Sequence, residues 1–233
     1  MNIIITGGTK GIGLAIAEKF AQNGFNLAIC SRNYKDLQAM KKDFTTRYPK
    51  IDFLIKKTDM SKQKEVMAFA KHIQSKWKKI DVLINNAGVF LPGAIHQEAE
   101  GTLEKQINTN LYSAYHLTRA LLLLMLKRKS GYIFNMCSIA SIMAYPNGGS
   151  YSISKFALYG FSKVLRAEMK DKGIRVSAVL PGATWSNSWA GVDLPVERLM
   201  QASDVADAIW SAYNMTPSAV MEEIILRPQL GDL

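Results

Sequence analysis

Two side chains in the segment "YSISK", Tyr151 and Lys155, could together carry out acid–base chemistry. The surrounding pattern is helical, and a spacing of four places both side chains on one face, close enough to interact. A tyrosine titrates near pH 10, so work near neutrality needs a shift of about three units, or about 4 kcal/mol, which a lysine cation about 4 Å away can supply. The same spacing occurs by chance in many helices. The pair is a candidate proton donor if other segments point to the same place.

The segment "TGGTKGIG", residues 6–13, has the glycines of a turn that approaches a ligand closely. It joins an apolar run to a helical pattern, and Gly7, Gly11 and Gly13 would leave the N–H groups at the helix start open to a pyrophosphate. An ordinary sharp turn between a strand and a helix also recruits glycine, and the spacing is not GxGxxG. The phosphate-binding turn and the ordinary turn are both open at this point. In either case Lys10 gives the turn a positive charge.

The next apolar run ends in "ICSRN", which bears on the nucleotide that such a turn would bind. Folds that bind NAD place an acidic residue about twenty positions beyond the glycine turn, whereas an arginine there accommodates the 2′-phosphate of NADP. Ser31 takes the acidic position and Arg32 follows it. An ordinary surface arginine is the alternative for Arg32 alone. With Lys10 nearby, the pattern favours NADPH or NADP+, because a serine and two cations can hold a phosphate that a carboxylate would repel.

Strand-like and helix-like patterns alternate along the chain. The expected strands are 2–6, 26–31, 51–57, 82–85, 132–136, 175–180 and 223–226, and helices are expected to begin near Gly11, Lys35, Lys62, Leu103, Ser150 and Ser203. Such alternation requires crossover connections and predicts an α/β fold: a single doubly wound parallel β-sheet, the Rossmann fold, with helices on both faces. Ligands bind such sheets at the carboxyl ends of the strands, so the polar segments that follow the strands should meet in one crevice.

The bulk properties narrow the class of protein. The 233 residues, 48% hydrophobic and 21% charged, suit one domain over residues 1–233. Cys30 and Cys137 lie in apolar runs and are expected to be buried free thiols, which suits a reducing compartment. The opening "MNIII" lacks the basic region of a signal peptide, and the longest apolar run, "ALLLLML", is too short to span a bilayer. We therefore expect a soluble, cytoplasmic protein.

The net charge of +10 suggests an anionic partner, which could be a phosphate ligand, an acidic protein, nucleic acid or simply solvent ions. Most lysines fall on helical stretches such as "KKDFTTRYPK", where they would form a solvated face. The sequence has no known nucleic-acid-binding motif and no basic stripe interleaved with aromatic residues. We expect no nucleic-acid partner, no membrane partner and no metal.

The chemical segments together resemble the short-chain dehydrogenase/reductase family. The resemblance covers nearly the whole chain in the family's order: "TGGTKGIG", "NNAG" at 85–88, "INTN" at 107–110, "NMCS" at 135–138, "YSISK" and "PG" at 181–182. Ser138 precedes Tyr151 by thirteen residues, as it does in the family. No single motif is decisive, but the set is highly specific.

The resemblance implies roles for the matching residues around a nicotinamide cofactor that supplies the hydride. Tyr151 would protonate the carbonyl oxygen, Ser138 would hydrogen-bond that oxygen, and Lys155 would lower the pKa of the tyrosine and bind the nicotinamide ribose. Asn110 would hold a water of the proton relay behind the lysine. Lys10 and Arg32 would hold the 2′-phosphate, and a basic residue at the Lys10 position is typical of members that prefer NADP. The remaining cofactor-binding set is Thr6, Gly7, Gly11, Ile12, Gly13, Ser31, Asp59 facing the adenine, Asn86, Gly88, Pro181, Gly182 and Ser186.

Two segments are expected to enclose the substrate. Residues 183–201 would form a lid, and its apolar side chains are Trp185, Trp189, Val192 and Leu194. The opposite wall would comprise Ile139, Ile142, Met143 and Tyr145. These side chains suggest a small or medium apolar ketone or aldehyde, although the tryptophans could equally pack the lid onto the body. The apolar excess of "AYHLTRALLLLML", with the pattern at 150–172, resembles the helices through which family members form homodimers or homotetramers.

Three functions stay open at the level of the sequence. The ending "EEIILRPQLGDL" lacks the "DGG" turn of 3-oxoacyl-[acyl-carrier-protein] reductases and resembles the small 3-hydroxy acid dehydrogenases and sepiapterin-reductase-like members. We therefore predict an NADPH-dependent carbonyl reductase, working reversibly. Lys129 and Lys172 keep the carrier-protein reductase as the alternative, because such enzymes have basic residues there for an acidic partner. The third is a sensor that binds NADP(H) without turnover, although such proteins usually lose part of the catalytic set.

Overall fold

Residues 1–186 and 191–232 are described by the structure, which is a computed structural model. Within these residues lies one seven-stranded sheet with the order β3-β2-β1-β4-β5-β6-β7, and every neighbouring pair is parallel. The strands are β1 (Asn2–Thr6), β2 (Asn26–Ser31), β3 (Phe53–Lys57), β4 (Val82–Asn85), β5 (Gly131–Met136), β6 (Ile174–Pro181) and β7 (Glu223–Leu226).

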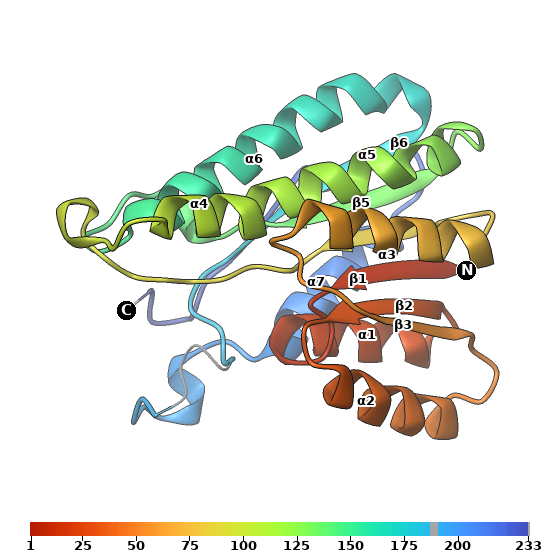
Figure 1. Ribbon diagram of the computed structural model, residues 1–233, viewed down its shortest axis with the longest axis horizontal. Helices are drawn as coiled ribbons and strands as arrows, with labels where there is room; N and C mark the ends of the chain where they lie inside the picture. The colour runs from red at the N-terminus through yellow and green to blue at the C-terminus, as the bar shows by residue number, and fades with distance from the viewer. Residues whose placement is uncertain (187–190, 233) are drawn as a thin grey trace.

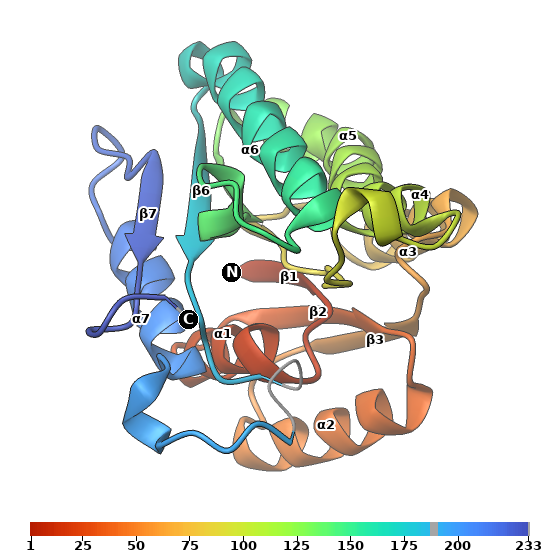
Figure 2. The same ribbon diagram turned by 90° about the vertical axis from the view of Figure 1, so that its left-hand side faces the viewer.

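Helices cover both faces of this sheet. They are α1 (Gly11–Gln22), α2 (Tyr34–Arg47), α3 (Gln63–Lys76), α4 (Thr102–Ile107), α5 (Ser113–Leu126), α6 (Gly149–Met169) and α7 (Ala202–Tyr213). Short turns are η1 (Ile95–Gln97), η3 (Ile139–Ser141), η4 (Lys170–Lys172), η6 (Val196–Arg198) and the π-helical η2 (Asn108–Tyr112). Figures 1 and 2 show α1, α2 and α7 below the sheet and α3 to α6 above it.

The strands bury side chains on both faces, as the sandwiched position of the sheet requires. Ile3 and Ile5 of β1 pack into the core on the side of α1, α2 and α7. Ile4, between them, packs into the core on the side of α3 and α5. Successive side chains of a strand point to opposite faces, so a strand that is apolar throughout needs a helical layer on each side.

The predicted α/β fold with a parallel sheet and helices on both faces is confirmed. Four strands have the predicted bounds, but the third begins at Phe53 and not at residue 51, because Ile51 donates its N–H to the Tyr48 carbonyl in a turn. Cys30 and Cys137 are buried free thiols, as expected, and burial raises their pKa to about 12 and about 11. Among the described residues, no helix is long and apolar enough to cross a membrane.

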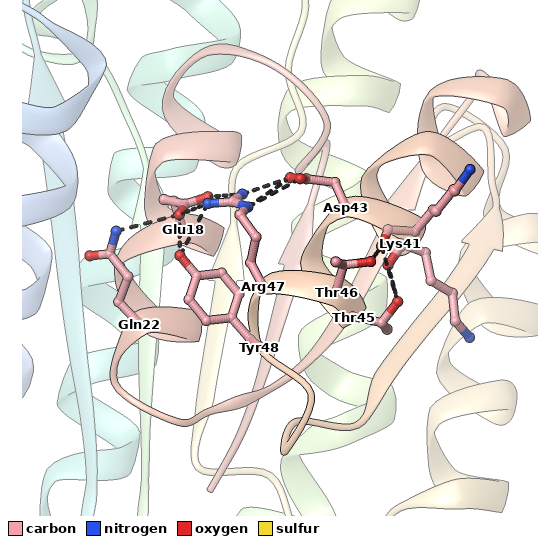
Figure 3. Close-up of polar contacts among 9 residues, drawn as sticks. Glu18, Gln22, Lys41, Asp43, Thr45, Thr46, Arg47 and Tyr48 are labelled. Carbon is pink, nitrogen blue, oxygen red and sulfur yellow. Dashed lines mark hydrogen bonds and ion pairs between the residues drawn. The ribbon is translucent and has the colours of Figure 1, made fainter.

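Helices α1 and α2 are joined by a polar cluster (Figure 3). Arg47 donates through Nη1 and Nη2 to the Glu18 carboxylate of α1, at 2.5 and 2.8 Å, and Nη2 also lies 2.7 Å from an oxygen of Asp43. The Tyr48 hydroxyl donates to Glu18 as well. The hydrogen bonds from Arg47 lower the pKa of Glu18. The cluster holds together the two helices that follow the glycine turn and the Ser31–Arg32 corner.

The strand order reverses between β1 and β4, because the chain crosses to one side of β1 for β2 and β3 and to the other side for β4 onward. The crevice outside the carboxyl ends of strands at such a point is where ligands bind in open α/β sheets. The segments that follow β1, β2 and β4 meet at this edge.

Candidate active site

The turn after β1 is fastened to the end of β4 by two polar side chains. Thr6 Oγ1 accepts hydrogen bonds from the backbone N–H groups of Asn86 (2.9 Å) and Ala87 (2.8 Å). Asn86 Nδ2 donates in return to the carbonyl oxygens of Thr6 (2.8 Å) and Gly7 (3.1 Å). Thr6 and Asn86 thus set the shape of the turn.

The glycines of the turn are required by its geometry. Gly7 and Gly11 adopt φ values of +65° and +53°, which other residues rarely adopt. A Cβ on Gly13 would lie 2.5 Å from the Gly7 carbonyl oxygen and 2.6 Å from Asn86 Nδ2. The start of α1 therefore presses against the turn, and its free N–H groups face the crevice edge, an arrangement suited to a phosphate.

A cavity of about 610 Å³ opens in front of the turn. It brings together most of the predicted site residues: Gly7, Lys10, Gly11, Ile12, Gly13, Ser31, Arg32, Asp59, Asn86, Gly88, Tyr151, Lys155 and Ser186. Residues from five strand ends and from α6 thus surround one space. The predicted residues outside its lining are Thr6, Asn110, Ser138, Pro181 and Gly182.

Tyr151 lies in the first turn of α6 and forms a hydrogen bond with the side chain of Ser138, which follows β5. Lys155, one turn further along α6, donates from Nζ to the Met136 carbonyl at 2.8 Å, and its Nζ lies 5.7 Å from the centre of the Tyr151 ring. The three side chains predicted to take part in proton transfer are therefore neighbours, and two of them, Tyr151 and Lys155, line the cavity.

The electrostatic part of that prediction was wrong for this geometry. Burial raises the pKa of Tyr151, and the hydrogen bond with Ser138 only partly offsets the rise. Burial lowers the pKa of Lys155 to about 8. The lysine ammonium is turned to the Met136 carbonyl, and its own charge is disfavoured by the buried setting, so it does not pull the pKa of Tyr151 down.

Asn110 lies behind the cavity within η2, where the helix widens to π-helical spacing. Its Oδ1 accepts from the Val89 N–H at 2.8 Å, and its Nδ2 donates to the Val89 carbonyl at 3.0 Å and to Ser154 Oγ at 2.8 Å. A Cβ on Gly88 would lie 3.3 Å from Asn110 Oδ1 and 3.6 Å from Lys155 Nζ. Asn110 therefore fixes the strand end that borders Lys155.

The far end of the cavity holds the corner after β2. Ser31 Oγ accepts from Thr9 Oγ1 at 3.2 Å, and Lys10 Nζ lies 3.1 Å from the Asp36 carboxylate. From the sequence we predicted two cations and no carboxylate around the 2′-phosphate. This prediction was wrong, because Asp36 in the first turn of α2 lines the same cavity. Arg32, the second cation, makes no ion pair within the described part of the chain.

The proposed lid is partly visible. Trp185 donates its N–H groups to segment 196–200: Nε1 to the Val196 carbonyl (2.7 Å) and the backbone N to the Met200 carbonyl (2.9 Å). These hydrogen bonds stay within segment 183–201, so they hold the lid segment together and test neither the substrate role nor the packing of the lid on the body. Val192 is exposed, and Trp189 lies outside the described residues.

Sequence analysis missed an aromatic neighbour of the candidate proton donor. The Phe90 ring stands edge-on to the Tyr151 ring, with centroids 4.7 Å apart, and Phe90 is 42% exposed at the cavity. Phe90 follows the "NNAG" segment by two residues, and nothing in its sequence context marks it. The predicted opposite wall contributes the exposed side chains Ile142, Met143 and Tyr145, whereas Ile139 is half-buried.

The model of the family described as short chain dehydrogenase matches residues 1–194. The chain belongs to this family. It is an oxidoreductase that interconverts alcohol and carbonyl groups with a nicotinamide cofactor. Four of the motifs that suggested the family, those at 6–13, 85–88, 107–110 and 151–155, contribute residues to the cavity lining.

Alignments with other short-chain dehydrogenases extend over most of the chain. A sepiapterin reductase from Chlorobaculum tepidum is 34% identical, and the match covers 99% of this chain and 97% of that protein. A 3-oxoacyl-[acyl-carrier-protein] reductase from Chlamydia trachomatis is also 34% identical, over 77% of this chain and 72% of that protein. A metagenomic short-chain oxidoreductase, solved in complex with NADP, is 26% identical with a TM-score of 0.84 and covers 98% of this chain and 97% of its own.

Proposed function

We propose that this protein is an NADPH-dependent carbonyl reductase that converts a small or medium apolar ketone or aldehyde to the alcohol, and catalyses the reverse reaction. The observation that carries the proposal is that one cavity is lined by Tyr151 and Lys155, with Ser138 hydrogen-bonded to Tyr151, and also by Lys10 and Arg32. The first group suits proton transfer to an oxygen, and the second suits a phosphorylated ribose.

The proposed chemistry uses side chains in three roles. Tyr151, kept protonated by its raised pKa, donates its hydroxyl proton to the substrate oxygen. Ser138 hydrogen-bonds the same oxygen and stabilises the charge that develops on it. Lys155, whose pKa is lowered to about 8 and which is still mostly charged at pH 7, binds the cofactor ribose and returns a proton to the tyrosine. The bound nicotinamide supplies the hydride.

The glycine turn fits a dinucleotide because its glycines have no side chains to fill the space where the phosphates would bind. The 2′-phosphate of NADPH would lie with Lys10, Arg32 and the Ser31 hydroxyl, and the NADP in the solved metagenomic relative supports this choice. No carboxylate occupies position 31, where it would accept from the ribose hydroxyls of NADH.

The cofactor preference has a direct test in Ser31→Asp. We expect this change to lower kcat/KM with NADPH by about tenfold or more and to raise it with NADH, because a carboxylate repels the phosphate and accepts from a ribose hydroxyl. Both efficiencies are measured for the native and altered proteins. Equal native efficiencies with the two cofactors, or an unchanged value with NADPH in the variant, would contradict the proposed role of this corner.

The proposed substrate class draws on apolar and aromatic side chains. Phe90 packs against Tyr151 at the cavity, and the exposed Ile142, Met143 and Tyr145 are proposed to form the opposite wall. The sepiapterin reductase, which matches almost the full chain, supports a compact carbonyl substrate more than a carrier-bound one, because the carrier-protein reductase match covers a smaller share of both chains.

A panel of ketones and aldehydes at fixed NADPH tests this function. It contains diketones, pterin carbonyls, 3-oxo acids and a 3-oxoacyl thioester offered free and on carrier protein. We expect turnover of free apolar carbonyls. Tight NADPH binding without turnover of any member would favour the sensor instead, and turnover confined to the carrier-bound thioester would favour the carrier-protein reductase.

Within one chain, Lys129 and Lys172 give the carrier-protein alternative no support. Both precede the amino ends of strands, β5 and β6 respectively. Tyr151 lies in the first turn of α6 and Lys172 follows the end of this 21-residue helix, so nearly the whole helix, roughly 30 Å long, separates the two. The substrate edge of the sheet is the opposite one.

The proposal includes a homodimer or homotetramer of a single-domain cytoplasmic protein spanning 1–233. Large apolar side chains stay exposed along the outer faces of α4 to α6, on the side of the sheet seen at the top of Figure 1. They are Leu103, Tyr115, Leu123, Ile153, Phe156 and Val164, with Tyr112 in η2. An apolar surface of this extent suits a contact with a second copy.

A further inference from the structure

We propose that Asp36 is a specificity-determining residue that competes with the cofactor 2′-phosphate for Lys10 and so limits the preference for NADPH. This inference rests on the proposed use of NADPH and names a residue that acts against it. Lys10 Nζ lies 3.1 Å from Asp36 Oδ2, and both residues line the cavity with Ser31 and Arg32. The ion pair thus spans the place assigned to the 2′-phosphate.

Asp36 is the better-fixed member of the pair. Its side chain is 29% exposed, whereas the Lys10 side chain is 57% exposed. It stands in the first turn of α2, which Asn33 caps by accepting from the N–H groups of Lys35 and Asp36. A carboxylate is favoured at the N-terminus of a helix, so the position of Asp36 does not depend on Lys10 being beside it.

Lys10 is held less firmly. It precedes α1 in an extended conformation, and its side chain makes no capping hydrogen bond. A long, exposed side chain of this kind can leave Asp36 for a phosphate oxygen, but it must then give up the ion pair or share its charge between two anions. Either course costs free energy that NADH, which lacks the phosphate, does not have to spend.

Asp36 also acts on the phosphate directly, since two anions in one cavity repel each other. Arg32 makes no ion pair in the described part of the chain, although it acts electrostatically on Asp59, which lines the same cavity. The 2′-phosphate would thus meet one cation that already has an ion pair, Lys10, and one that has none among the described residues, Arg32. Because Asp36 partly neutralises Lys10, the attraction between Lys10 and the phosphate is weaker than that of an unpaired lysine.

The test is calorimetric titration of the full chain with NADP+ and with NAD+, read as the ratio of the two Kd values. We expect Asp36→Asn to shift this ratio toward NADP+ by about threefold, the range of an exposed ion pair. The matched control is Asp43→Asn, which removes the same charge two turns further along α2, where Asp43 pairs with Arg47. The control should stay within about twofold of the native ratio by the same scale.

A double-mutant cycle with Lys10→Met separates competition for Lys10 from direct repulsion. We expect Asp36→Asn to have a smaller effect in the Lys10→Met background, because no ion pair remains to be released. An effect of Asp36→Asn no larger than that of Asp43→Asn, or an equal effect in both backgrounds, overturns the inference. Failure of the proposed NADPH preference is seen separately, as native protein that binds NAD+ more tightly than NADP+.

Discussion

At the scale of one residue, the buried charge of the catalytic Lys155 lowers the stability of the fold. The side chain is 6% exposed, its ammonium donates to the Met136 carbonyl, and burial lowers its pKa to about 8. An unfolded lysine titrates near 10.4, so between about pH 8 and pH 10 the unfolded chain binds the extra proton. The buried charge therefore lowers the free energy of unfolding below pH 8, and this loss disappears as the pH rises from about 8 to about 10.

Lys155→Met tests that cost. At pH 7 we expect the variant to exceed the native protein in free energy of unfolding by about 2 kcal/mol, and the difference should shrink toward pH 10 as the native lysine loses its proton. Denaturant unfolding of both proteins at several pH values measures the difference, so that titrating tyrosines cancel. A difference that does not change with pH would show that the lysine charge is not what destabilises the fold.

At the scale of elements, the start of α6 is held by a residue from a distant loop. Glu98, which follows η1, accepts from the backbone N–H of Ser150 at 2.8 Å and from the Ser150 hydroxyl. Gly149 makes this approach possible, because a Cβ there would clash with Glu98 Oε1 and with the Gly93 carbonyl oxygen. Glu98 thus caps the helix whose first turn carries Tyr151.

Removing this cap should affect both stability and catalysis. For Glu98→Ala we expect a loss of about 1 kcal/mol in the free energy of unfolding and a lower kcat, because the first turn of α6 frays. Glu98→Gln should keep part of the stability and part of the kcat, since its amide oxygen can still accept the hydrogen bond from the Ser150 N–H. Glu100→Ala is the matched control, an exposed glutamate from the same loop. Equal behaviour of Glu98→Ala and Glu100→Ala would remove the capping role.

The elements were predictable from the sequence because each carries a local signal. An apolar run buried on both faces identifies β1, β2 and β4, and the glycine turn identifies the start of α1. The Lys10–Asp36 ion pair, the Phe90–Tyr151 ring contact and the Glu98 cap join residues from different segments. Such contacts depend on how loops cross at the sheet edge, which neither propensity nor periodicity encodes. The direction of the Tyr151 pKa shift was missed for the same reason, because it depends on burial.

At the scale of the whole molecule, one side of the protein is left more apolar than the other. Leu123 of α5 and Val164 of α6 are 63% and 58% exposed, on helices whose opposite faces already pack against the sheet. A helix that is apolar on two faces is expected to bury one face within its own chain and the other against a second chain.

Leu123→Glu tests whether this face joins two copies. We expect light scattering to find a dimer or tetramer for the native protein at micromolar concentration and a smaller species for the variant, because a charge would be buried in the contact. Lys127→Glu, one turn further on α5, is the control for the added negative charge. A native monomer, or assembly unchanged in Leu123→Glu, would contradict the proposed interface.

The central claim is that the Tyr151 hydroxyl is the proton donor at a cofactor site that binds without it. The measurement that tests it most directly is kcat with the best carbonyl of the panel, together with the Kd for NADPH, in native protein and Tyr151→Phe. We predict that kcat falls by about a thousandfold while the Kd changes by less than about twofold, because phenylalanine keeps the ring against Phe90 and removes only the hydroxyl group that carries the proton. Substantial turnover by a folded Tyr151→Phe protein would contradict the claim.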